Sequence, residues 1–85
     1  MKIDNLEKCF KAAQDNNANY IAVLIMMPGF ENPEIIINTK ENIDSKLTYY
    51  KKAYNNDLTL KTFNEIKIIG FTYGNTFSEL EKDLI

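Results

Sequence analysis

The apolar run at residues 20–27 constrains the fold of this chain more than any other feature. A continuous run without polar alternation is typical of a β-strand that is covered on both faces. The run is only about half as long as a segment that crosses a bilayer. We therefore expect a buried central strand, with the rest of the 85-residue chain arranged around it as one domain over residues 1–85.

Three segments have the spacing of amphipathic helices. In the first, Asp4 and Glu7 have the spacing of a capping box, and the apolar residues recur at helical intervals: Leu6, Cys9, Phe10 and Ala13. The second helix is expected to begin near Asn38 or Thr39 and to bury a stripe of Ile43, Leu47, Tyr50 and Tyr54. A full capping box at residues 76–79 precedes a short third helix, whose apolar side is Phe77, Leu80 and Leu84.

Three further strands complete the expected sheet. Residues 34–38 follow the central run after a short loop, which favours an antiparallel pair. Residues 58–61 alternate between apolar and polar side chains, as an edge strand does. A turn at Asn64 and Glu65 leads to a strand at 66–73, in which Gly70 marks a bulge. The sequence therefore predicts an α+β fold in the order αββαββα, with three helices packed on a mostly antiparallel four-stranded sheet.

Residue types that the chain lacks exclude common catalytic and metal-binding arrangements. There is no histidine, and all 10 basic residues are lysine. The usual neutral general base, the commonest metal ligand and the bidentate phosphate clamp are therefore missing. Acidic pairs such as Glu41 with Asp44 are typical of helix starts. Cys9, on the apolar side of the first helix, is predicted to be a core residue. We expect no enzyme activity, no metal and no cofactor.

Charge and cysteine usage indicate the compartment and narrow the partners. The net charge of −2 is too small to indicate a nucleic-acid surface. A single cysteine cannot form an internal disulfide, which fits a reducing cytosol. The first residues carry no apolar run behind Lys2, unlike a signal peptide. The sequence therefore predicts a cytoplasmic protein that inserts into no membrane and for which nucleic acid is not the expected partner.

Residues 49–54 interleave tyrosines with lysines and form the most informative surface segment. Such interleaving can stack bases and neutralise phosphates, and exposed tyrosine is favoured at protein interfaces. Helical spacing leaves Tyr49, Lys51 and Lys52 on the outer face of the second helix. Phe30, in a loop between two prolines, is another aromatic residue that is expected to be exposed. We predict that Phe30, Tyr49, Lys51 and Lys52 contact a partner.

Most of the chain resembles small proteins encoded by phages and prophages of low-GC Gram-positive bacteria. The segments that carry the resemblance are residues 34–38, 41–44, 49–54, 57–62 and 68–74. The resemblance implies no catalytic motif. It implies instead a protein that binds and inhibits or modulates a host or defence component, for example as an anti-CRISPR protein.

The residues leave a second function open, which is sequestration of a small signalling molecule, such as a nucleotide, between subunits of an oligomer. The tyrosines and the amino end of the last helix at residues 75–77 would contact the small molecule. A homodimer is compatible with either function, because a strand at a sheet edge and a small core both favour association.

Overall fold

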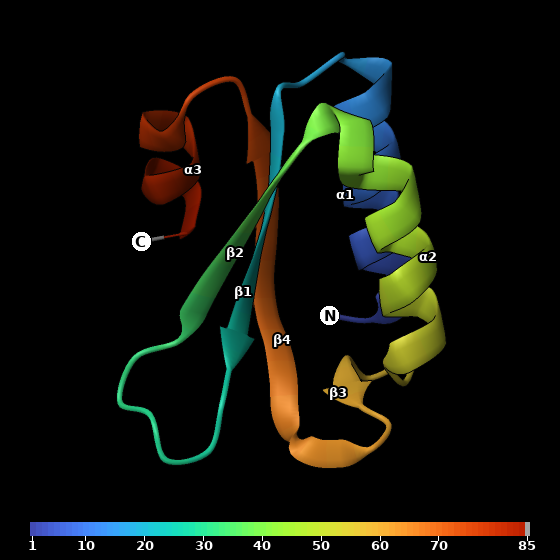
Figure 1. Cartoon of the computed structure of the whole chain (residues 1–85), viewed down its shortest axis with the longest axis vertical. Helices are drawn as coiled ribbons and strands as arrows, with labels where there is room; N and C mark the ends of the chain where they lie inside the picture. The colour runs from blue at the N-terminus through green and yellow to red at the C-terminus, as the bar shows by residue number, and fades with distance from the viewer. Residues whose placement is uncertain (85) are drawn as a thin grey trace.

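The computed structural model describes residues 1–84 and has the α+β architecture that the sequence predicts (Figure 1). Its helices are α1 (Ile3–Asp15), α2 (Ile43–Ala53) and α3 (Phe77–Leu84), and a short 3₁₀ helix, η1 (Lys40–Asn42), leads into α2. Its strands are β1 (Tyr20–Met26), β2 (Glu34–Thr39), β3 (Thr59–Leu60) and β4 (Phe63–Gly74). Within residues 1–84, no helix is both long enough and apolar enough to cross a membrane.

The four strands form one antiparallel sheet in the order β2-β1-β4-β3. The apolar run forms β1, an inner strand of this sheet. The prediction of a buried central strand is therefore confirmed. Figure 1 shows α1 and α2 together on one face of this sheet and α3 on the other face. The sheet has two edges, β3 as the sequence predicts and β2.

The main core lies between the sheet and the pair α1 and α2. Alternate residues of β1 point into it, because side chains in a strand alternate between faces. The fully buried members include Leu6, Phe10, Ile21, Ile43, Leu58 and Ile68, together with Val23, Ile25 and Tyr50. The stripe of Ile43, Leu47, Tyr50 and Tyr54 is buried as predicted. Phe10 meets Tyr50 edge to face, with ring centroids 5.9 Å apart.

The start of α1 differs from the prediction. The capping residue is Lys2, whose backbone N–H donates to Oδ1 of Asn5 at 2.8 Å. The predicted capping box of Asp4 and Glu7 is therefore wrong. The helix begins earlier because Ile3 packs against the core and its N–H donates to the carbonyl of Asn56 at 2.9 Å.

The hairpin between β3 and β4 also differs from the prediction. Leu60 pairs with Phe63, so the turn lies at residues 61–62 and β4 runs straight through Asn64 and Glu65. The predicted turn at those two residues is wrong. Leu58 lies just before β3 with a left-handed backbone (φ 70°) and a fully buried side chain.

The bulge predicted at Gly70 is confirmed. Leu24 pairs with Gly70 and the next residue, Ile25, pairs with Ile68, so Ile69 is the extra residue. A Cβ at Gly70 would lie 3.4 Å from Cδ2 of Leu84. The carboxyl end of α3 therefore packs close to β4 at Gly70.

Candidate protein-binding surface

The outer face of α2 presents a tyrosine that neighbouring side chains hold in place. Tyr49 is 50% exposed, because the residues that point to the core are its helical neighbours Ile43, Leu47 and Tyr50. Its ring meets Tyr50 edge to face at a centroid distance of 5.3 Å. The Nζ atom of Lys46 lies 5.5 Å from the centroid of the same ring. A side chain positioned in this way loses little conformational freedom when it binds a partner.

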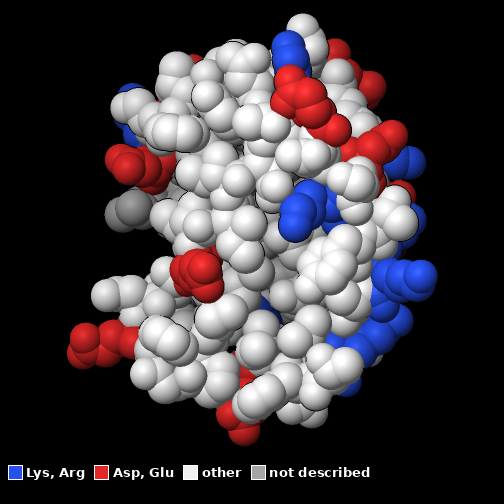
Figure 2. All heavy atoms as spheres, viewed as in Figure 1, with Lys and Arg blue, Asp and Glu red and all other residues white. Residues whose placement is uncertain are grey.

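α2 carries three lysines near Tyr49 in sequence, Lys46, Lys51 and Lys52, and their surroundings differ. Lys51 donates to Oε2 of Glu7 on α1 at 2.8 Å, so it joins the two helices as well as facing solvent. Lys52 has no carboxylate within ion-pair distance in the part of the chain that the structure describes. Figure 2 shows basic side chains gathered along the side of the molecule where Figure 1 places the carboxyl-terminal half of α2. This face is locally basic although the chain is slightly acidic.

The ion pair between Lys51 and Glu7 has a measurable consequence. The hydrogen bond from Lys51, together with the charges of Lys51 and Lys11, lowers the pKa of the Glu7 carboxyl. We expect Lys51→Ala to raise that pKa toward its ordinary value, while Lys52→Ala, next along the same helix, leaves it unchanged. A side-chain NMR titration of Glu7 in the two variants measures both. An equal response to the two substitutions would show that the ion pair does not form.

The same pair determines one part of the pH dependence of stability. The folded-state pKa of Glu7 lies below its unfolded value, so its contribution is fully present above the unfolded pKa. The contribution is lost as the pH falls through the folded pKa. Because the side chain of Glu7 retains 26% exposure, solvent screens the pair and its effect on stability is small.

Phe30 lies away from the α2 face. It follows a turn in which Pro28 precedes Gly29, and Gly29 has a positive φ of 84° that favours glycine. Phe30 is 67% exposed. Figure 1 shows this β1–β2 loop beyond the end of the sheet, on the side away from α2. The structure therefore places Tyr49, Lys51 and Lys52 on one helix, with Lys51 turned toward Glu7 of α1, and leaves Phe30 on a separate surface.

A second exposed apolar area, which the sequence analysis missed, lies where β2 meets α3. Ile35 and Ile37 of β2, with Phe77, Leu80 and Leu84 of α3, line a depression of about 140 Å³. Consecutive isoleucines at residues 35–37 were the available signal, because a strand that is apolar on both faces at a sheet edge leaves one face open. We call this area the β2–α3 surface.

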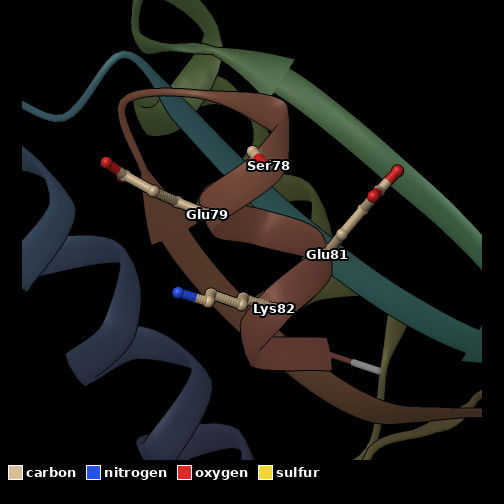
Figure 3. A pocket seen from close by; sticks show the side chains of 4 residues that line it. All are labelled: Ser78, Glu79, Glu81 and Lys82. Atoms are coloured by element: carbon tan, nitrogen blue, oxygen red, sulfur yellow. The ribbon is translucent and has the colours of Figure 1, made fainter.

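A depression on α3 has lining side chains that do not converge on one point. It is lined by Ser78, Glu79, Glu81 and Lys82. In Figure 3, Glu79 and Lys82 project from one side of the helix and Glu81 from the other. Oε2 of Glu79 accepts the backbone N–H of Asn75 at 2.7 Å, and Glu79 N–H donates to Oγ1 of Thr76 at 3.2 Å. Thr76 thus caps the helix as predicted, but Glu79 accepts the N–H of Asn75 and not that of Thr76, so the full capping box is only half formed. These side chains occupy the helix start that a phosphate would need.

The thiol of Cys9 is partly buried. It packs against the core, and burial raises the pKa of its thiol to about 11. Because the thiolate is the reactive form, we expect alkylation of the folded chain at pH 8 to be roughly a hundredfold slower than that of the urea-unfolded chain. Timed iodoacetamide labelling with mass spectrometry measures the ratio. Equal rates would contradict a core role for Cys9.

Comparison with protein-family models, curated proteins and solved structures finds no match to this chain. Within residues 1–84, no group of three or more histidine, cysteine, aspartate or glutamate side chains is arranged to hold a metal ion. The function must therefore be inferred from the surfaces of this chain.

Proposed function

We propose that this chain is a non-catalytic protein that acts by binding one partner protein through the outer face of α2. The observation that carries the proposal is Tyr49, a half-exposed aromatic side chain held between Tyr50 and Lys46. Tyrosine is among the residues that contribute most to binding energy at protein interfaces. The lysines around it favour a partner with an acidic contact surface.

The roles within this surface differ. Tyr49 is the apolar anchor, and Lys52 supplies a charge that no ion pair within residues 1–84 neutralises. Lys51 contributes a charge that Glu7 partly satisfies, so its contribution to binding is smaller. Phe30 remains a predicted contact, on a separate surface. The resemblance to phage and prophage proteins directs the search for the partner to bacterial defence systems, CRISPR effectors among them.

The experiment is affinity capture with the full chain from a lysate of the bacterium that encodes it. The variant Y49A/K52A removes the Tyr49 anchor and the charge of Lys52. The matched control is the variant F63A/K61A. Phe63 and Lys61 are likewise an exposed aromatic residue and an exposed lysine, on the β3–β4 hairpin. We expect one protein in a stoichiometric ratio with the wild type and the control. Loss of an anchor that contributes about 2 kcal/mol lowers its capture by Y49A/K52A about thirtyfold. Equal capture by all three proteins would contradict the proposal.

Sequestration of a small signalling molecule gains no specific support from the geometry. Tyr50 and Tyr54 are buried in the core, and burial raises the pKa of Tyr50 to about 12. The amino end of α3 is capped by its own side chains. This function stays a prediction, and a nucleotide-dependent rise in melting temperature is its test.

A further inference from the structure

The free edge of β2 is prepared for pairing with another strand. The N–H of Lys40 donates to the carbonyl of Asn19 at 2.9 Å, in register with the β1–β2 ladder. In an antiparallel ladder, alternate residues direct their backbone groups to the same neighbour. Glu34, Ile36 and Asn38 therefore direct theirs to β1, and Ile35, Ile37 and Thr39 direct theirs outward.

The two edges of the sheet are protected to different degrees. Edge strands usually avoid pairing with strands of other molecules because they are short or contain a proline, a lysine or a bulge. β3 is only 2 residues long. β2 is 6 residues long, and within Glu34–Thr39 it has no proline, no lysine and no bulge. In Figure 2, which has the same view as Figure 1, the surface over β2 is mainly uncharged.

Apolar side chains extend from this edge onto one face of the sheet. Ile35 and Ile37 are exposed there beside the partly exposed α3, as the β2–α3 surface. Figure 1 shows α3 beside one half of the sheet only. Phe77 packs on Tyr20, which pairs with Thr39, so the amino end of α3 lies at the Thr39 end of β2. The half of this face beyond Ile35 is left uncovered.

We propose that two copies of this chain form a dimer in which their β2 strands pair antiparallel across a twofold axis at Ile37. Since the axis is normal to the sheet, facing residues lie on the same face and have numbers of the same parity. With Ile37 facing itself, Ile35 faces Thr39 and Glu34 faces Lys40. Symmetry repeats the opposite charges, so two complementary pairs flank the isoleucines.

This register is more favourable than the register with the axis at Ile36, which also places residues of the same face opposite each other. With Ile36 on the axis, Thr39 would face Pro33, which has no N–H to donate to it. Glu34 would face Asn38 and lose its opposite charge. The two sheets become one continuous sheet of eight strands, twice the 4-stranded sheet of one chain.

The dimer does not depend on the proposed partner and does not block it. α2 lies on the opposite face of the sheet from α3 (Figure 1). Both Tyr49 side chains stay exposed in the dimer, which presents two binding surfaces. Loss of dimerisation and loss of partner capture are therefore separate outcomes.

Sedimentation velocity of the whole chain over a range of concentrations tests the dimer. We expect a species of twice the 9.8 kDa chain mass. Ile37→Lys places two ammonium groups on the axis and should give a monomer, while Ile69→Lys should remain a dimer. Ile37 and Ile69 are 40% and 37% exposed, but Ile69 lies on β4, away from the edge. A monomeric wild type, or a dimer that survives Ile37→Lys, would overturn the proposal.

A charge exchange tests the register with exposed residues that folding does not need. Glu34→Lys and Lys40→Glu each place like charges face to face, and each should weaken the dimer by about tenfold or more. The double variant E34K/K40E restores opposite charges and should return the dissociation constant to that of the wild type. Failure of the double variant to recover would overturn the pairing of Glu34 with Lys40.

Discussion

Replacing Phe10 by alanine is expected to remove a large part of the stability of the fold. The ring is fully buried between α1, α2 and the sheet, and it packs edge to face on Tyr50. Truncation of a buried phenylalanine costs about 3–5 kcal/mol, out of about 5–15 kcal/mol for a whole domain. For a chain of this size, we expect the melting temperature to fall by roughly 15 °C or more. Urea and thermal unfolding followed by circular dichroism measure the loss.

The matched control is the same substitution at Phe30. That side chain is exposed in the β1–β2 loop, so Phe30→Ala should change the free energy of unfolding by no more than about 0.5 kcal/mol. The same side chain is removed at a buried position and at an exposed one. Similar losses at both positions would contradict the placement of the core between the sheet and the helix pair.

Substitution of Leu58 is also expected to cause a large loss of stability. The order of the variants is unusual, because glycine should be more stable than alanine there. Its side chain is buried and its backbone is left-handed, a conformation that costs a leucine about 1 kcal/mol. Its N–H donates to Asn55 and its carbonyl accepts the N–H of Ile68, each at 2.9 Å. We expect Leu58→Ala to cost about 2–5 kcal/mol. Leu58→Gly should be about 1 kcal/mol more stable than Leu58→Ala, because glycine adopts a positive φ without strain.

The control for this reversal is Ile68, which is equally buried in β4 and, unlike Leu58, has no positive φ. There Gly should be less stable than Ala by about 0.5–1 kcal/mol, the usual order for regular structure. Urea titrations of the four variants, all with a stabilising osmolyte, compare the two orders. If Gly is the weaker residue at both positions, the backbone at Leu58 is not left-handed.

The order of elements could be predicted because it depends on local patterns. The stripe at Ile43, Leu47, Tyr50 and Tyr54 has helical spacing, and the structure buries all of it. The bulge followed from Gly70 in a strand. These signals need only neighbouring residues, and the fold preserves them.

The elements that were wrong depend on tertiary contacts. α1 begins before Asp4 because Ile3 reaches the core and Asn56 accepts its N–H. The β3–β4 turn lies at residues 61–62, where no glycine or asparagine indicates it. Leu58, just before this hairpin, is buried and left-handed, whereas the alternation of residues 58–61 predicted a strand residue there. A local pattern contains none of these contacts.

The candidate site could be predicted only in part for the same reason. Helical spacing predicted outward positions for Tyr49, Lys51 and Lys52, but Lys51 lies toward α1, against Glu7. Whether Phe30 joins them depends on the topology, which puts the β1–β2 loop on the side of the sheet away from α2. The ion pair of Lys51 with Glu7 spans two helices and was not visible from either segment.

The most direct test of the central claim is photocrosslinking from the α2 face in the cell that encodes the chain. Benzoylphenylalanine replaces Tyr49 in one protein and Phe63 in a second, since these aromatic side chains are similarly exposed, at 50% and 47%. We predict that position 49 crosslinks to one protein, the same one that the wild type captures, and that position 63 does not. Equal crosslinking from both positions, or none from position 49 while capture persists, would contradict binding through α2.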